Sequence, residues 1–201
     1  MHHTVQAENW GIRLRPVQLE DADFIVWLRN LEHARGRVGD SAMDRAAQED
    51  WLKKYFDRAG DYYFIIETAG RIPVGAYGIY DVHGRSAESG RWVIRPEVPA
   101  AIPSAMLAFD TAFSKLQLKE LRVRTVSSNR NVLSLNIKLG FHQTRIEPSA
   151  QIIGGQPVDM VHFLLPADEW PPRRQKLLPL ALLAERQVLE WEHTQPVNKP
   201  F

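Results

Sequence analysis

The segment from residue 99 to residue 105 could bind an anion through its backbone. It stands in front of an apolar helix that we expect to begin near Ser104. Helix N-termini bind phosphate groups because their unpaired N–H groups and the positive end of the helix dipole face the anion. Pro99 and Pro103 lack an N–H donor. The N–H donors that remain belong to Ala100, Ala101, Ile102, Ser104 and Ala105.

Side chains that do chemistry by themselves are sparse or badly spaced. No paired metal-ligand spacing occurs among His33, His83, His142, His162 and His193, so we expect no metal site. Ser127 and Ser128 lack the flanking glycines of a nucleophilic serine and are typical of a turn. The chain contains no cysteine, which excludes a disulfide framework and thiolate metal sites.

Composition restricts the class of protein. The 201 residues allow one large domain, or one domain with an appendage. The net charge of +1 argues against a protein that binds nucleic acid or a membrane surface by bulk charge. The first fifteen residues do not have the pattern of a secretory signal, and no apolar run approaches the roughly 20 residues that span a bilayer. We therefore expect a soluble, cytoplasmic protein.

The first half of the chain predicts two helices followed by a hairpin. Residues 12–16 alternate as a strand does, and a helix capped by Asp21 or Asp23 follows. Ser41 and Asp44 form a variant capping box that opens a second helix. Residues 62–67 and 74–80 then alternate on either side of a turn, which predicts an antiparallel hairpin.

The second half predicts a mixed sheet with covering helices. A turn over 82–87 leads to a strand at 90–95, the helix near Ser104, and a strand at 121–126. Asn129 or Asn131 caps a short helix that ends at Gly140. Strands around 143–146 and 158–164 complete the sheet, with a turn at residues 154–155. The order of elements predicts a mixed α/β sheet flanked by helices.

The C-terminal part differs in composition from the rest. A helix within residues 177–191 is expected to begin near Pro179, because proline is tolerated in the first helical turn. We therefore divide the chain into an N-terminal tail at 1–11, one α/β domain at 12–165, and a C-terminal helix and tail at 166–201. The helix is apolar on more than one side, so it or the late strands could form a homodimer.

The segment 129–141 carries a resemblance to a known family. It is similar to the second cofactor motif of the GNAT superfamily of acetyl-CoA dependent N-acetyltransferases at Asn129, Lys138, Leu139, Gly140 and Phe141. The segments 14–16, 21–30 and 87–97 look like the opening strand, the first helix and the entry to the central strand of the same family, in the branch of ribosomal-protein and amino-sugar acetyltransferases. The resemblance implies a splayed central sheet and acetyl-CoA as co-substrate.

One part of the chain departs from that family. Family members usually place an Arg or Gln, a Gly, and a Gly or Ala where this chain has Pro99, Ile102 and Ser104. The branched side chain of Ile102 would crowd a phosphate or force the loop outward. Two hypotheses follow. Either the remaining amides, Ser104 and nearby cations still hold the diphosphate, or the domain is a degenerate module that binds or scaffolds without transferring acetyl groups.

The resemblance also implies roles for particular residues. The strands 91–95 and 121–126 would splay, and the pantetheine arm would pair with the exposed edge lined by Trp92, Val93 and Ile94. Glu88 is the first candidate for the base that takes the amine proton, ahead of the carboxylates of Glu67, Asp81 and Glu97. Val93 could equally be sheet core, and Glu88 could equally be an exposed turn residue.

Many relatives carry a tyrosine seven residues after the motif asparagine, where this chain has Asn136. Asn136 or Ser134 would position a water near the leaving thiolate. Asn129, Ser134 and Lys138 are expected to contact the cofactor. The acceptor is expected to be a small-molecule amine, an amino sugar or a protein N-terminus. Residues 35–37 and Asp40 could contact an anionic or sugar-nucleotide acceptor, or could be an ordinary solvated loop.

Overall fold

The computed structural model describes residues 3–32, 34 and 44–195. Eight strands form a single open sheet in the order β1-β2-β3-β4-β5-β6-β8-β7. All neighbouring strands are antiparallel except β5 and β6, which are parallel. The strands are β1 (Ala7–Asn9), β2 (Ile12–Pro16), β3 (Tyr62–Thr68), β4 (Pro73–His83), β5 (Ser86–Ile94), β6 (Glu120–Val126), β7 (His142–Ile153) and β8 (Gln156–Pro166).

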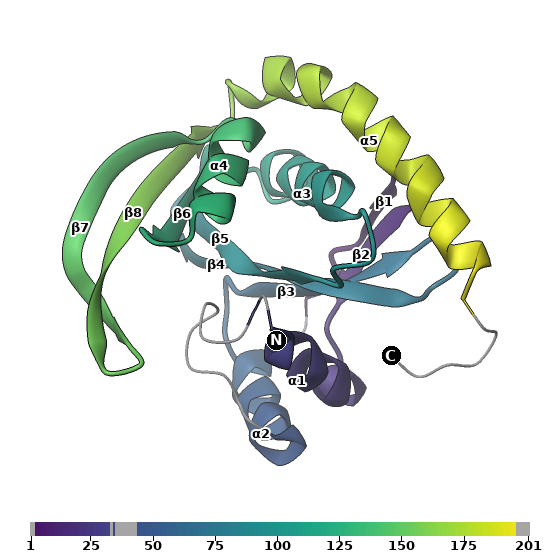
Figure 1. Cartoon of the computed structure of the whole chain (residues 1–201), viewed down its shortest axis with the longest axis horizontal. Helices are drawn as coiled ribbons and strands as arrows, with labels where there is room; N and C mark the ends of the chain where they lie inside the picture. Colours follow the sequence, from purple (N-terminus) through teal and green to yellow (C-terminus); the bar gives the residue numbers. More distant parts are fainter. Residues whose placement is uncertain (1–2, 33, 35–43, 196–201) are drawn as a thin grey trace.

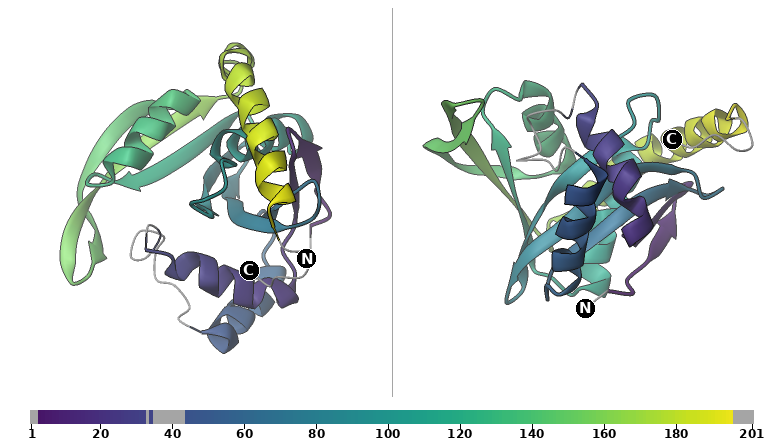
Figure 2. Two further views of the ribbon diagram at one scale, coloured as in Figure 1. Left: turned by 45° about the vertical axis from the view of Figure 1, so that its right-hand side comes forward. Right: turned by 90° about the horizontal axis from the view of Figure 1, so that it is seen from below.

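Helices cover both faces of this sheet (Figure 1). The helices α1 (Ala22–Asn30) and α2 (Arg45–Phe56) lie on one face, and Figure 2 shows them in front of the sheet when it is seen from below. On the opposite face lie α3 (Ala101–Asp110) with its continuation at Thr111–Lys115, α4 (Arg130–Leu139) and α5 (Trp170–His193). The mixed α/β architecture predicted from the sequence is confirmed, including the C-terminal helix.

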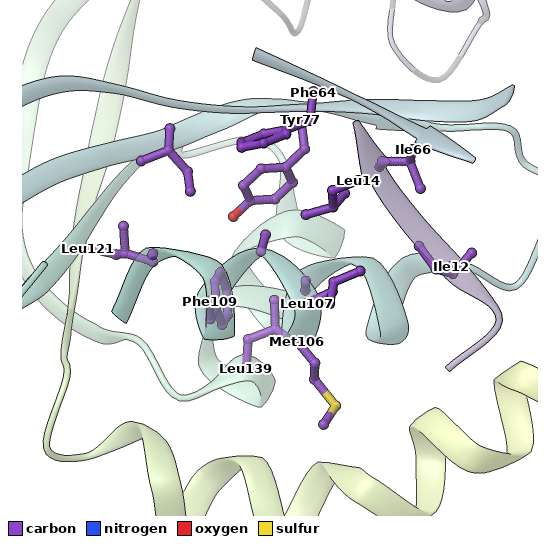
Figure 3. Packing of buried hydrophobic residues seen from close by; sticks show 14 of the residues in the cluster. Ile12, Leu14, Phe64, Ile66, Tyr77, Met106, Leu107, Phe109, Leu121 and Leu139 are labelled. Carbon is purple, nitrogen blue, oxygen red and sulfur yellow. The ribbon is translucent and has the colours of Figure 1, made fainter. Parts of the chain in front are cut away.

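Each face of the sheet has its own apolar core. On the side of the sheet that α3 covers, Leu14, Phe64 and Tyr77 of the strands share one buried cluster with Leu107 (Figure 3). Phe109 of α3 belongs to the same cluster and packs its ring against those of Phe141 and Trp170. Under α1 and α2, a second cluster contains Phe24, Leu28, Leu52, Tyr63 and Val93. The two cores fix the strands from both sides, so the strand ends near β5 and β6 are rigidly placed.

The sheet begins earlier than the sequence predicts. Ala7–Asn9 forms a short strand that pairs with β2, with Ala7 opposite Leu14. The turn uses Trp10 and Gly11, both at positive φ. Trp10 is buried although it stands in a turn, so part of the expected N-terminal tail belongs to the packed core.

Three predicted helix starts are wrong. The second helix begins at Arg45, capped by Asp44, whose carboxylate accepts from the N–H of Ala47, rather than at Ser41. The helix expected near Ser104 begins at Ala101, with Pro103 inside its first turn. The C-terminal helix begins at Trp170 instead of near Pro179, and Pro179 lies inside it.

The early start of α5 has a clear structural cause. The indole N–H of Trp170 donates to Asp110 at 2.7 Å, and Nε of Arg174 donates to both oxygens of the same carboxylate at 3.0 and 2.9 Å. Leu177, Ala181 and other apolar residues of α5 are then buried against α3. These contacts stabilise the first turns of α5. Their stabilisation outweighs the cost of Pro179 inside the helix, where it lies on the exposed side.

The strand β5 begins at Ser86, within the turn predicted over 82–87 and before the strand predicted at 90–95. Glu88 therefore belongs to the strand. β5 pairs with β6 only at Ser86 opposite Glu120, Ala87 opposite Leu121 and Glu88 opposite Arg122. Beyond Glu88 the two strands have no pairing in the described structure, which confirms the predicted splay.

A β-bulge accompanies the splay. Ala76 pairs with Val93 and Gly78 with Gly90, so β5 has one residue more than β4 over this stretch. Arg91 occupies the bulge with φ of 50°, in the left-handed region that residues with a Cβ rarely adopt. The bulge turns the end of β5 away from β6.

The late strands form a hairpin longer than the sequence predicts. The pairing of β7 and β8 extends from His142 opposite Leu164 to Ile153 opposite Gln156. Gly154 and Gly155, both at positive φ, form the predicted turn. The hairpin projects past α4 at one end of the sheet (Figure 1). None of the described helices is long and apolar enough to cross a membrane.

Candidate functional site

A cavity of about 910 Å³ opens where β5 and β6 separate. Its walls come from both strands, from α4, and from the α1–α2 side of the sheet. The residues of the central strands and of α4 that line it include Glu88, Trp92, Val93, Ile94, Arg124, Thr125, Asn129 and Asn136. The size and position of this cavity make it the candidate functional site.

Glu88 lies at the fork of the two strands. It is the last β5 residue paired with β6, and it is only 8% exposed. Its oxygens accept from Nε of Arg124 at 3.1 and 3.0 Å, and Oε1 accepts from the hydroxyl of Tyr80 at 3.2 Å. Glu88 is therefore a buried strand residue held in one orientation, and the alternative of an exposed turn glutamate is wrong.

The tyrosine beside Glu88 stays protonated at neutral pH. Burial and the negative charge of Glu88 raise the pKa of Tyr80 above its ordinary value. Its hydroxyl is thus a permanent hydrogen-bond donor to the carboxylate. Tyr80 and Arg124 both line the cavity, so the carboxylate faces it between two donors.

The other carboxylates considered from the sequence do not line the cavity. Glu67 is buried near the C-terminal end of β3, where it accepts from Arg13 at 3.3 Å and from Arg15 at 2.5 Å. Asp81 is exposed, at a positive φ in β4. Glu97 is exposed and pairs with Arg95 at 2.6 Å. Of the four candidates, Glu88 alone lies at the fork.

The end of β5 could hold the pantetheine arm of CoA. Trp92, Val93 and Ile94 all line the cavity. Val93 is also a member of the core under α1 and α2, so it is sheet core as well as part of the cavity wall. The indole N–H of Trp92 is buried and has no hydrogen-bond partner among the described residues. An orphaned donor beside an unpaired strand edge fits an amide-containing chain, because the amide carbonyls could accept from it.

The N-terminus of α3 offers fewer donors than the sequence suggests. The N–H of Ala100 donates to Val98 at 2.8 Å, and that of Ser104 donates to Ala100 at 3.0 Å. The hydroxyl of Ser104 donates to Ala101 at 3.2 Å. Ala101 lines the cavity, whereas Ala100, Ser104 and Ala105 are buried and do not.

The N–H groups of Ala101 and Ile102 remain, since the first residues of a helix have no intrahelical acceptor. Pro103 contributes no donor. The structure therefore leaves two amides at the helix N-terminus for a diphosphate.

The helix α4 brings two of its predicted residues to the cavity. Asn129 caps the helix through the N–H of Val132 at 3.4 Å and lines the cavity. Asn136 is 3% exposed, lines the cavity and donates through Nδ2 to the hydroxyl of Thr125 at 3.1 Å. Ser134 and Lys138 are exposed and are not brought to the cavity.

The glycine that ends α4 is required by its surroundings. Gly140 has φ of 105°, and a Cβ there would lie 2.8 Å from the side chain of Arg173. The predicted left-handed cap is therefore confirmed.

The α1–α2 side of the cavity holds residues that the sequence reasoning missed. They are Arg29, Trp51, Arg58 and Arg91, with Glu147 from β7. These residues come from five separate elements and segments, so no local spacing could have revealed them. Residues 35–37 and Asp40, expected near the acceptor, lie outside the described residues.

Three comparisons place the chain among known proteins. A sequence profile described as "Acetyltransferase (GNAT) domain" matches residues 12–142, more than half of the chain. No curated protein matches its sequence. The chain belongs to the GNAT acetyltransferase family.

Solved structures of that family have the same fold. A GCN5-related N-acetyltransferase from Brucella melitensis has a TM-score of 0.77 at 19% identity, with 89% of this chain and 86% of that chain covered. A spermidine N-acetyltransferase SpeG variant from Vibrio cholerae has a TM-score of 0.73 at 21% identity, with 82% and 99% covered. FdhC, described as a nucleotide-linked sugar GNAT, has a TM-score of 0.70 at 24% identity, with 90% and 98% covered.

Proposed function

We propose that this protein is an acetyl-CoA dependent N-acetyltransferase that acts on a primary amine of a small molecule or amino sugar. The observation that carries the proposal is the fork between β5 and β6, which opens into a cavity with the buried carboxylate of Glu88 at its base. The family supports acetyl transfer in general, and one SpeG structure is described as a complex with CoA and spermine.

Acetyl-CoA, when bound, supplies the acetyl group as a thioester. Trp92 and the free edge of β5 would hold its pantetheine arm, and the amides of Ala101 and Ile102 would face its phosphates. Glu88 accepts the proton that the amine loses as its nitrogen bonds to the acetyl carbon and the C–S bond breaks. Tyr80 and Arg124 keep the carboxylate of Glu88 directed into the cavity.

Asn136 would position the water that protonates the departing thiolate. Its Nδ2 already donates to Thr125, which fixes the side chain. The amide has a second N–H, which can orient a water toward sulfur but cannot itself release a proton at neutral pH. Protonation by water suffices, because a thiol with a pKa of about 8.5 is a fair leaving group.

The alternative function is a degenerate module that binds a partner or metabolite without acetyl transfer. The α3 N-terminus favours it, because Pro99 and Pro103 have no N–H and Ile102 replaces the usual glycine. Isothermal titration calorimetry with acetyl-CoA separates the two. Saturable binding in the micromolar range supports the enzyme, and absence of heat at millimolar acetyl-CoA supports the module.

We also propose that the protein forms a homodimer through apolar surface at its C-terminal end. Leu180, Leu182, Leu183 and Leu189 of α5 are exposed, as are Ile146 and Ile152 of the β7–β8 hairpin. Large exposed apolar side chains that gather on one element are typical of an interaction surface.

A further inference from the structure

The charged residues that line the cavity are mostly cationic. Among the described residues they are five arginines and two glutamates, namely Arg29, Arg58, Arg91, Arg95, Arg124, Glu88 and Glu147. Both glutamates already have cationic partners. Glu88 accepts from Arg124, and Glu147 accepts from Arg145 at 3.2 Å and from the ring of His162 at 2.8 Å. A second ammonium group on an acceptor would therefore meet arginines rather than a carboxylate without a partner.

Three of the arginines come from the α1–α2 side of the sheet. Arg29 belongs to α1, Arg58 follows α2, and Arg91 occupies the bulge of β5. Asp61 is a carboxylate beside two of them: it accepts from Arg91 at 2.6 and 3.0 Å and lies 3.9 Å from Arg58. We call Arg29, Arg58 and Arg91 the arginine cluster.

Arg91 is held rigidly in this cluster. Besides its two hydrogen bonds to Asp61, its guanidinium lies 4.1 Å from the ring centre of Tyr80, 5.1 Å from that of Trp51 and 5.6 Å from that of Tyr63. Cation–π contacts and a bidentate carboxylate together fix its position. Because Tyr80 also donates to Glu88, Arg91 and the proposed base contact the same tyrosine, Arg91 through its ring and Glu88 through its hydroxyl.

The charge of Arg91 acts on Arg29, so two members of the arginine cluster lie near each other. Burial lowers the pKa of Arg29, and the charge of Arg91 lowers it further, whereas Tyr63 raises it. Burial also opposes the charge of Arg91, whose pKa is nevertheless raised by Asp61. Two guanidinium groups that repel each other in a partly buried wall would be stabilised by an anion bound between wall and cavity.

From this arrangement we propose that the acceptor is an amine that also carries an oxyanion, a phosphate or a carboxylate, which the arginine cluster binds while Glu88 faces the amine. The inference rests on the proposed acetyltransferase function and names its substrate class. The same charges disfavour a polyamine, which carries several cations and no anion. The cavity thus separates two tasks, with the anion at the α1–α2 wall and the amine at the fork.

Matched amino sugars test the proposal by binding as well as turnover. Glucosamine, glucosamine 6-phosphate and muramic acid carry the same amine and ring, with no anion, a phosphate and a carboxylate, respectively. Binding of each sugar is measured by titration calorimetry, with and without saturating CoA. Each sugar is then assayed as an acceptor with acetyl-CoA. Spermidine is the fourth ligand. We expect at least one of the two anionic sugars to bind about tenfold or more tightly than glucosamine, and spermidine to bind weakest.

Two variants locate the effect. Arg58→Gln removes one guanidinium that is partly exposed, so the fold should survive, and it should abolish most of the preference for the anionic sugar. Arg186→Gln removes the same charge from the exposed side of α5 and should leave the preference unchanged. The preference should also weaken as salt rises, because the contact is ionic.

The outcomes distinguish this inference from the proposed function. Equal binding of charged and uncharged sugars, tightest binding of spermidine, no binding of any sugar, or an unchanged preference in Arg58→Gln overturns the anionic acceptor. Loss of acetyl-CoA binding overturns the acetyltransferase proposal instead. A preference for phosphate over carboxylate, or the reverse, identifies which oxyanion the cluster takes.

Discussion

Glu88 is the residue on which the proposed chemistry depends. Replacing it by glutamine keeps the shape and one acceptor oxygen for Arg124 and Tyr80 but removes the proton acceptor. We expect Glu88→Gln to lower kcat by about 100-fold or more, the usual contribution of a general base. Circular dichroism should show an unchanged fold, and calorimetry an unchanged affinity for acetyl-CoA.

The matched control for this prediction is Glu97→Gln. Glu97 is an exposed carboxylate paired with Arg95, outside the cavity. Its replacement should leave kcat within about twofold. If Glu88→Gln turns over as fast as the control, Glu88 has no part in proton transfer, and a water in the cavity must take the amine proton instead.

Residue-scale prediction from the sequence succeeded where the information is local. Asn129 and Gly140 begin and end α4 as their cap preferences require. Arg91 could not be found in this way, because its role depends on a bulge in β5 and on rings from α2, β3 and β4. The role of a residue at such a junction is set by tertiary structure alone.

At the scale of elements, α2 is tied to β3 by one buried hydrogen bond. The hydroxyl of Tyr55 accepts from the N–H of Tyr63 at 2.9 Å. Tyr55→Phe leaves that N–H buried without its partner, so we expect a loss of about 1–3 kcal/mol in the free energy of unfolding. Urea denaturation measures it. Tyr62→Phe serves as the control. Tyr62 lies next to Tyr63 on β3 and is less buried than Tyr55, so its replacement should change the free energy of unfolding less.

The same tyrosine predicts a loss of stability at alkaline pH. Burial raises the pKa of Tyr55 from 10.0 to about 12. Because the folded state binds this proton more tightly than the unfolded state, the stabilisation is complete below pH 10 and is lost as pH rises toward 12. Melting temperatures recorded from pH 8 to pH 12 should fall above pH 10, and fall less steeply in Tyr55→Phe. An equally steep fall in the variant would exclude Tyr55 as a cause.

In the proposed enzyme, the start of α3 would determine how tightly the diphosphate of acetyl-CoA is bound. Pro103 stands in the first turn of α3, where any other residue would add an N–H near those of Ala101 and Ile102. We expect Pro103→Ala to tighten acetyl-CoA binding by about tenfold or more, the net effect of one hydrogen bond to a charged group. Pro171→Ala makes the same change at the start of α5, away from the cavity, and should not alter affinity.

The starts of α3 and α5 could not be predicted from local sequence patterns. The apolar stripe predicts a start of α3 near Ser104, and the preference of proline for the first helical turn predicts a start of α5 near Pro179; both positions are too late. In α3 the proline follows Ala101 and Ile102, and in α5 Pro179 lies in the interior. The contacts of Trp170 and Arg174 with Asp110, 60 or more residues apart, determine where α5 begins. No pattern within the helix itself contains that information.

At the scale of the whole molecule, the order of elements predicts the mixed α/β sheet, and the resemblance to the GNAT family adds the fork. A parallel pair inside an otherwise antiparallel sheet follows from the helix between β5 and β6, since parallel strands need a crossover. The charge of the cavity wall was not predicted, because α1, the segment after α2 and the bulge meet only in the folded chain. The fold was thus accessible from the sequence and its family resemblance, whereas the charge of the cavity wall was not.

The proposed homodimer has two candidate surfaces, and each makes a different prediction. Leu183 is 54% exposed on α5 and Ile152 is 65% exposed on β7, where a buried partner surface would remove both from water. Light scattering of the native protein should give twice the chain mass of 23.0 kDa. A charged residue in a buried apolar interface is strongly unfavourable, so the variant that yields a monomer identifies the interface. Leu183→Glu tests α5 and Ile152→Glu tests the hairpin, and each serves as the control for the other. A native mass of one chain over the working range of concentration would contradict the dimer, and the exposed leucines of α5 would then be ordinary surface residues.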